Sequence, residues 1–224
     1  MSRIAAISSM NTKLTEYYHR RAAEYEAIYH KPERQADLLE ATGLLQEIFR
    51  EKNVLEIACG TGFWTEKIAR TAQSILATDI NESVLEIARN KDYPRRNVRF
   101  ETADLFSFDP GDKAEALFGG FIWSHIPLET LPDFTKKVGT MVAPGATIVF
   151  MDNRYVQGSS TPIAERDTAG NTYQLRRLNN GDTYRVLKNF PDRETFENVL
   201  AGKAAGLQFI ALSYFWIGVY QTLP

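Results

Sequence analysis

Apolar and polar positions alternate along the middle of this chain in a regular rhythm of strands and helices. Apolar runs of strand length predict strands at residues 54–58, 74–79, 97–102, 116–124 and 146–152. Apolar residues at three- and four-residue spacing predict helices near residues 64–71, 82–90 and 128–141, the last ended by Pro144-Gly145. This alternation is typical of an α/β fold, in which a mostly parallel sheet has helices on both faces.

The flanks of this region have other patterns. Before it, apolar residues at helical spacing predict a helix over residues 12–29, then a second helix with Pro32 in its first turn. After it, residues 153–171 are polar and contain glycine and proline, which predicts a long excursion without regular structure.

A hairpin is predicted next, because residues 173–178 and 183–188 alternate at period two around Asn179-Asn180-Gly181-Asp182. A helix around Phe196 and strands at residues 208–213 and 215–220 follow.

Composition narrows the class of protein. The 224 residues, 44% of them hydrophobic and 24% charged, fit one globular domain. The formal net charge of −2 gives no basic field, so we expect no nucleic-acid partner. Cys59 is the single cysteine, which excludes an internal disulfide. Without a bilayer-spanning run or a signal-peptide pattern, we expect a cytoplasmic protein with no membrane partner.

The most informative motif is the glycine-rich turn after the first strand of this series. Gly60 and Gly62 lack Cβ atoms, so a ligand can approach bare backbone N–H groups at the start of the next helix. Asp79 ends the next strand about 20 residues later, where a carboxylate can bind both hydroxyls of a ribose. The motif predicts a cofactor that contains a nucleoside.

Bulky residues near the turn distinguish two kinds of nucleoside cofactor. A dinucleotide fingerprint has the form G-x-G-x-x-G, with a third small residue for close packing of helix and strand. Here Phe63, Trp64 and Thr65 follow Gly62, and Trp64 would obstruct a pyrophosphate over the first helical turn. A NAD-binding oxidoreductase is therefore the less favoured alternative.

The segment Glu56-x-Ala58-Cys59-Gly60-Thr61-Gly62 resembles the first motif of the class I S-adenosylmethionine-dependent methyltransferases. The resemblance covers residues 53–153. Within this range it includes Asp79-Ile80-Asn81, Thr102-Ala103-Asp104-Leu105 and Trp123-Ser124-His125. It implies a Rossmann-like, mostly parallel seven-stranded sheet, with S-adenosyl-L-methionine as cofactor and S-adenosyl-L-homocysteine as product.

The resemblance also implies which residues bind the cofactor. Glu56 would lie beneath the methionine end, and Asp79 would bind the ribose. Asp104 would accept a hydrogen bond from the adenine amino group, unless it caps a turn instead, and Leu105 would pack against the ring. The expected cofactor residues are Tyr25, Glu56, Ala58, Gly60, Gly62, Trp64, Asp79, Ile80, Asp104, Leu105 and Ser124.

Residues 17–25 resemble the N-terminal helix that covers the cofactor in many small-molecule methyltransferases. In that position Arg21 or Tyr25 would meet the methionine carboxylate or the substrate, and Tyr18 is a further candidate on the substrate side. A helix that closes the site would exclude water and order the reactants.

His125 is the one histidine at a predicted strand end that faces the site, and its side chain suits removal of a proton from the acceptor. Alternatively, this position contacts the cofactor through its backbone only. Arg154 and Tyr155 are candidate substrate residues at the start of the polar excursion. The hairpin adds aromatic and cationic side chains, which suit a planar or anionic small substrate or form a solvated face. They are Tyr173, Arg176, Arg177, Tyr184, Arg185 and Lys188.

Asp152-Asn153 resembles part of the metal site of catechol-type O-methyltransferases. That site also has an aspartate at the end of the preceding strand, where this chain has Trp123-Ser124-His125. We therefore expect no metal.

Together these features predict one domain with a helical cover (1–50), a cofactor-binding core (51–153), a substrate-side insertion (154–190) and a C-terminal helix with strands (191–224). We expect transfer of a methyl group by in-line displacement to an oxygen or nitrogen of a small-molecule metabolite, as in secondary metabolism. Methylation of a protein side chain and a non-catalytic cofactor-binding role in a complex are the alternatives. The sequence leaves the oligomeric state open.

Overall fold

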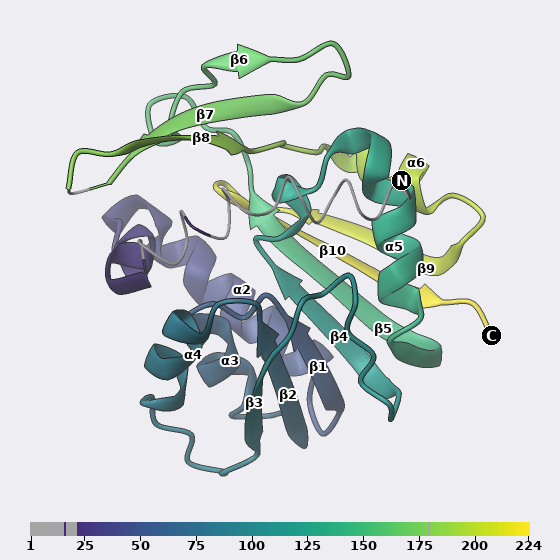
Figure 1. Ribbon diagram of the computed structural model, residues 1–224. Coiled ribbons are helices and arrows are strands. Elements are labelled where there is room, and N and C mark those ends of the chain that lie inside the picture. Colours follow the sequence, from purple (N-terminus) through teal and green to yellow (C-terminus); the bar gives the residue numbers. More distant parts are fainter. Residues whose placement is uncertain (1–15, 17–21, 179) are drawn as a thin grey trace.

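The computed structural model describes residues 16, 22–178 and 180–224, and its main body is a seven-stranded sheet in the order β3-β2-β1-β4-β5-β10-β9 (Figure 1). The strands from β3 to β5 run parallel, whereas β10 is antiparallel to both β5 and β9. This confirms the mostly parallel, Rossmann-like sheet. The strands are β1 (Asn53–Ile57), β2 (Ser74–Asp79), β3 (Val98–Thr102), β4 (Ala114–Gly120), β5 (Val142–Asn153), β9 (Ala204–Ala211) and β10 (Phe215–Thr222).

Helices cover both faces of this sheet. The α-helices are α2 (Gln35–Ile48), α3 (Phe63–Ile68), α4 (Glu82–Arg89), α5 (Leu131–Gly139) and α6 (Arg193–Leu200). Helices α2 and α3 bury Leu45 and Ile68 in one apolar cluster, and α5 and α6 bury Phe134 and Phe196 in another. The two-residue period of β1 sends Val54 to the first cluster and its neighbour Leu55 to the second, so the strand joins both halves of the core.

The N-terminal cover is only partly within the described residues. The 3₁₀ helices η1 (Ala22–Tyr29) and η2 (Pro32–Arg34) lead into α2. Pro32 begins η2, which agrees with its predicted place in the first turn of the second helix. Of the α-helix predicted over residues 12–29, residue 16 is α-helical, whereas residues 22–29 form a 3₁₀ helix instead. Residues 12–15 and 17–21 lie outside the description.

The insertion forms its own small antiparallel sheet of β6 (Glu165–Arg166), β7 (Thr172–Arg177) and β8 (Thr183–Leu187). It lies over the carboxyl ends of β4 and β5 (Figure 1). The predicted hairpin is confirmed: Arg177 pairs with Thr183, and Gly181 adopts a φ of 93° in the connection.

Two boundaries differ from the sequence prediction. Strand β4 ends at Gly120 rather than Ser124, and a separate 3₁₀ turn, η3 (Trp123–His125), follows. Pro144-Gly145 does not end a helix, because α5 stops at Gly139 and the pair lies inside β5. The pairing of β4 with β5 shifts register there, and Gly145 has a φ of 74°, so the dipeptide forms a bulge in the strand.

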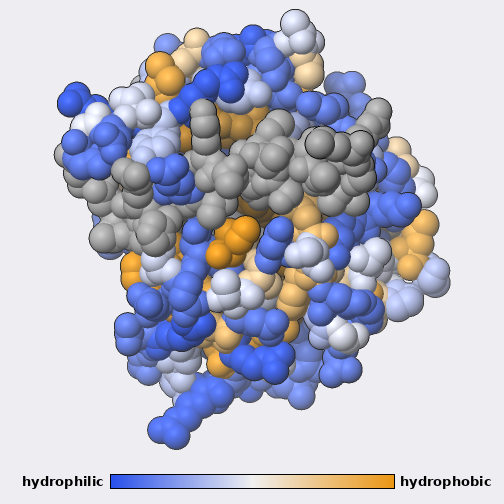
Figure 2. Space-filling view, viewed as in Figure 1, coloured by the Kyte–Doolittle hydropathy of each residue, from blue (hydrophilic) through white to orange (hydrophobic). Residues whose placement is uncertain are grey.

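Polar and charged side chains cover most of the face in Figure 2, while hydrophobic side chains gather near its middle. Within the described residues, we find no helix with the length and apolar character needed to cross a membrane.

Candidate active site

The turn between β1 and α3 has a backbone conformation that glycine favours. Ala58, Gly60 and Gly62 have φ angles of 51°, 56° and 76°. A Cβ atom on Gly62 would lie 2.8 Å from the Tyr93 hydroxyl and 2.9 Å from the Ala88 Cβ. Glycine is therefore needed at position 62 both for the φ angle and for the close packing of the turn against α4.

Asp79 at the end of β2 fastens this turn. Its side-chain oxygens accept hydrogen bonds from the backbone N–H groups of Gly60 and Asn81, both at 2.9 Å. Burial raises the pKa of Asp79, although these backbone donors act against the shift. The carboxylate predicted to bind a ribose thus has a second task, since it holds the glycine turn in place.

Glu56, in β1 just before the glycine turn, is buried, with 2% of its surface exposed. Within the described residues its Oε2 has no hydrogen-bond partner. Burial, with a smaller contribution from the negative charge of Asp79, raises the pKa of Glu56 to about 8 although Thr65 opposes the shift. The side chain borders a small pocket that is lined by Tyr29, Glu56, Ala58, Cys59, Thr61, Phe63, Trp64, Gly120 and Phe121.

The N-terminal cover closes one side of this pocket. Tyr29 stacks on Phe63 with ring centroids 3.7 Å apart. The Glu26 carboxylate accepts hydrogen bonds from Thr61 Oγ1 at 2.7 Å and Lys91 Nζ at 2.5 Å. These contacts bind the cover to the glycine turn, and neither Glu26 nor Tyr29 was predicted as a site residue from the sequence.

The other candidates from the cover lie outside the described side chains. Tyr18 and Arg21 belong to the segment that the structure does not describe, and only the backbone of Tyr25, in η1, is described.

The expected adenine side lies at the ends of β2 and β3. Ile80 follows Asp79 and is 41% exposed. Asp104 Oδ1 accepts a hydrogen bond from the Phe106 backbone at 3.0 Å, which is the turn-capping alternative. Leu105 is half-buried against the cluster of α5 and α6.

His125 lies in η3, beyond the end of β4, so its predicted place at a strand end is wrong. Its Nδ1 lies 2.6 Å from the Leu187 carbonyl oxygen, which only accepts, so Nδ1 carries the proton. Burial, together with the positive charges of Lys188 and Arg176, lowers the pKa of His125 well below its ordinary value. The imidazole is therefore neutral near pH 7 and a weak base.

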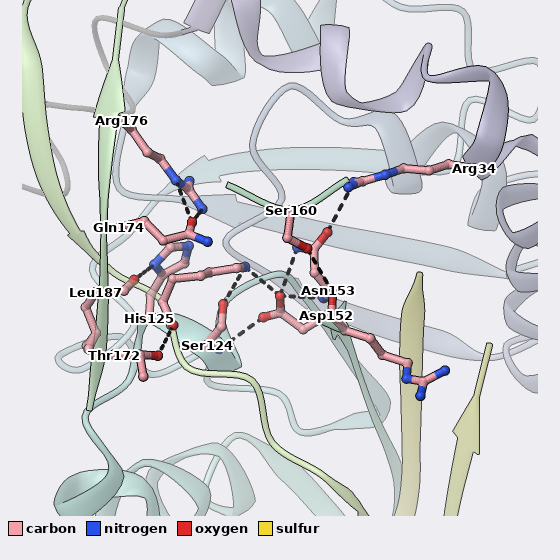
Figure 3. A network of polar contacts seen from close by, with 12 residues as sticks. Arg34, Ser124, His125, Asp152, Asn153, Ser160, Thr172, Gln174, Arg176 and Leu187 are labelled. Carbon is pink, nitrogen blue, oxygen red and sulfur yellow. Dashed lines mark hydrogen bonds and ion pairs between the residues drawn. The ribbon is translucent and has the colours of Figure 1, made fainter. Parts of the chain in front are cut away.

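Lys188 is the buried cation at the centre of this side of the site. Its Nζ donates to Ser124 Oγ at 2.6 Å and to Asp152 Oδ1 at 2.7 Å (Figure 3). Its side chain is 4% exposed, and that of Asp152 is fully buried. Although burial alone would raise it, the pKa of Asp152 is held below its ordinary value by the Lys188 charge. The ion pair joins the insertion to β5.

Lys188 is one of the cationic hairpin residues that the sequence offered for an anionic substrate or a solvated face. Its two-residue spacing from buried Val186 indicates the buried face. Of the two candidates that begin the insertion, Arg154 donates through Nη1 to the Leu212 carbonyl oxygen and so lies against the β9–β10 connection. Tyr155 is 39% exposed and packs edge-on against Phe190. Neither side chain makes a described hydrogen bond to Lys188, Ser124 or Asp152.

Comparison with known proteins supports the identity of this fold. Residues 54–145 match a family model described as a methyltransferase domain. The structure of the DhpI–SAH complex superposes with a TM-score of 0.77 over 95% of this chain and 96% of that chain, at 24% identity. The DhpI–SAM–HEP complex gives a TM-score of 0.75 over 92% and 95% of the two chains, also at 24% identity.

Curated relatives match more locally. Phosphoethanolamine N-methyltransferase 3 of Arabidopsis thaliana is 27% identical over 107 residues, which are 46% of this chain and 22% of that protein. Ribosomal RNA small subunit methyltransferase A of Listeria innocua serovar 6a is 31% identical over 96 residues, 43% of this chain and 32% of that protein. The chain thus spans less than a third of the length of either relative. Residues 54–145 of the chain thus match a methyltransferase domain, and the chain as a whole has the fold of the DhpI complexes.

Proposed function

We propose that this chain binds S-adenosylmethionine and transfers its methyl group to an oxygen or nitrogen atom of a small-molecule metabolite. The observation that carries the proposal is the glycine turn within the matched residues 54–145, with its positive φ angles at Gly60 and Gly62. Support for the cofactor comes from the DhpI complexes with SAH and SAM, which share the fold.

In this proposal the methionine end of the cofactor lies in the pocket beside Glu56 and beneath Tyr29, and its adenosine extends past Asp79 toward Ile80 and Asp104. Bound there, S-adenosylmethionine supplies a methyl group that is already activated by the sulfonium charge. The chain's own contribution is to align the acceptor for in-line displacement and to exclude water, and the buried ring of Tyr29 serves the second task.

The acceptor side favours a small molecule over a polymer. Lys188 and His125 are 3% and 7% exposed, so neither offers an open surface to a long chain. The formal net charge of −2 also provides no field for a polyanion. Ribosomal RNA, which the name of the Listeria relative specifies, is thus a less favoured acceptor here than a metabolite.

The cofactor assignment is tested by titration of S-adenosylhomocysteine into the wild type and Asp79→Ala in a calorimeter. We expect the variant to bind at least about tenfold more weakly, because it loses the ribose contact and the hydrogen bond from Gly60 that holds the glycine turn. Asp112→Ala, an exposed aspartate away from the turn, is the control and should bind as the wild type does. Equal affinity in Asp79→Ala would contradict the assignment.

The acceptor class is tested with S-adenosylmethionine that carries a labelled methyl group. The purified protein is incubated separately with a metabolite extract, a protein extract and ribosomal RNA, and the label is followed into each. We expect label in the metabolite fraction alone. Label in protein or RNA would identify one of the alternatives, and binding of NAD instead of S-adenosylhomocysteine would favour an oxidoreductase.

A further inference from the structure

Two buried cations from distant parts of the chain meet at the carboxyl end of β5. Arg34, in η2, donates from Nη1 to Asn153 Oδ1 at 3.4 Å. Lys188, just after β8, donates to Asp152, which is the neighbour of Asn153 in β5. Figure 3 shows Arg34 and the Asp152 network approaching this strand end from opposite sides. The two cations therefore share one small region of the site.

An aromatic pair lies beneath these cations. The Lys188 Nζ is 6.0 Å from the centroid of the Phe121 ring, and the Arg34 guanidinium carbon is 5.7 Å from that of Phe215. The two rings contact each other edge to face at 5.9 Å. Because Phe121 also lines the pocket beside Glu56, this aromatic floor continues directly from the space assigned to the cofactor.

The two cations differ in their partners: Lys188 contacts a carboxylate, whereas Arg34 contacts only neutral oxygens in the described part of the chain. The Asp152 carboxylate already accepts from the Ser124 and Asn153 backbone N–H groups as well as from Lys188. Arg34 is 8% exposed, and its described side-chain hydrogen bonds reach only the neutral oxygens of Asn153 and Ser159. Its Nε has no partner among the described residues. Burial lowers the pKa of Arg34, although the charge of Glu33, and to a smaller extent those of Tyr214 and Asp37, oppose the shift.

A buried guanidinium without a carboxylate in contact is costly, and an oxyanion bound there would lower that cost. We propose that Arg34 and Lys188 bind an anionic group of the methyl acceptor, a carboxylate or a phosphoryl group, while Phe121 and Phe215 support the rest of the molecule. The proposal rests on the proposed function, since it names the acceptor class of the same site. The insertion then has a defined role, because it supplies Lys188.

The test uses the full chain saturated with S-adenosylhomocysteine, into which inorganic phosphate and acetate are titrated separately while backbone amide NMR signals are followed. We expect saturable shifts at Asn153 and Phe121 with at least one of the two anions. In Arg34→Gln the dissociation constant should rise at least about tenfold, because a charge-assisted hydrogen bond is lost. Arg50→Gln is the matched control: Arg50 is exposed and paired with Glu47, and its variant should bind as the wild type does.

The role of Lys188 is tested in a double variant, because removing Lys188 alone would leave Asp152 buried without a counter-charge. The variant Lys188→Met is combined with Asp152→Asn, so that both charges of the pair are removed together. We expect the folded double variant to bind the anion at least about tenfold more weakly than wild type. Unchanged binding in this variant, or in Arg34→Gln, would overturn the proposal.

The two probes also distinguish the possible ligands. Stronger binding of phosphate would identify a phosphoryl group, and stronger binding of acetate a carboxylate. The absence of saturable binding by either anion, in protein that still binds S-adenosylhomocysteine, would overturn the anion site alone. Loss of S-adenosylhomocysteine binding in the wild type would instead contradict the proposed function.

Discussion

At the scale of single residues, two carboxylates beside the glycine turn have opposite surroundings. Asp79 accepts backbone hydrogen bonds on both side-chain oxygens, whereas the Glu56 Oε2 meets no donor in the part of the chain that the structure describes. Both are buried, and burial raises the pKa of each. The sequence placed both acids near the turn, but the donors that surround them come from the tertiary structure.

Glu56 makes the stability of the protein depend on pH. Its pKa is about 8 in the folded state and its ordinary value is 4.5, so the folded state holds the proton more tightly. The Glu56 contribution to the free energy of unfolding is therefore fully present below about pH 4.5 and is lost as the pH rises through 8. The largest slope from one group is about 1.4 kcal/mol per pH unit.

Glu56→Gln should remove this dependence, because the amide stays neutral at every pH. Urea unfolding at about pH 5 and about pH 8 measures the effect, and we expect the variant to gain stability relative to wild type as the pH rises. The exposed variant Glu40→Gln serves as the control and should keep a constant difference from wild type. A constant difference for Glu56→Gln as well would show that Glu56 is ionised in the folded protein near pH 7.

At the scale of elements, the structure shows two ways in which short segments position the site. The turn between β1 and α3 depends on its own glycines, with Gly62 packed against α4. The turn η3 depends on distant partners, since Ser124 binds Asp152 and His125 binds Leu187. Local sequence predicts the glycine turn well. It does not predict η3, because the apolar run of β4 continues along the sequence to Ser124.

The glycine turn can be compared directly with a glycine that has no such role. Gly62→Ala should destabilise the protein by more than about 1 kcal/mol and weaken S-adenosylhomocysteine binding, because alanine disfavours a φ of 76° and its Cβ would clash with Tyr93 and Ala88. Gly43→Ala in α2, where an added Cβ meets nothing within 4 Å, should stabilise by about 0.5–1 kcal/mol. Thermal unfolding and calorimetry of both variants measure the difference. Similar behaviour of the two would contradict this account.

At the scale of the whole molecule, the buried pair of Lys188 and Asp152 joins two sheets that are separate in the hydrogen-bond topology. The Asn189 side chain adds hydrogen bonds to the Ile126 carbonyl and to Asn171. The insertion is thus attached to the core at the same place where the acceptor is proposed to bind.

Asp152→Asn should weaken this attachment, because it leaves the Lys188 ammonium buried without a counter-charge. We expect a loss of about 3–5 kcal/mol in the free energy of unfolding, and partial recovery in the double variant with Lys188→Met. Urea unfolding measures the stabilities, and limited proteolysis reports whether the insertion is cut first. The exposed pair of Asp109 and Lys113 is the control: Asp109→Asn should have a far smaller effect. Equal losses in the two variants would show that the buried pair has no special role.

Sequence patterns alone predicted the α/β class, the succession of the central strands along the chain, the hairpin and the glycine turn. Each of these depends on local periodicity or on glycine backbone freedom, which are properties of short segments. It also placed Glu56 and Asp79 beside that turn. Here the sequence was sufficient because the carboxyl ends of neighbouring parallel strands meet at one edge of a sheet.

The arrangement of the acceptor side, by contrast, depends on how distant segments pack together. Arg34, Ser124, Asp152 and Lys188 come from four separate segments, and no local pattern states that they meet. Their hydrogen bonds depend on how the cover, β5 and the insertion pack together. Burial and charge then set the protonation of His125 and Asp152, because a pKa depends on every group near the proton and not on neighbours in sequence.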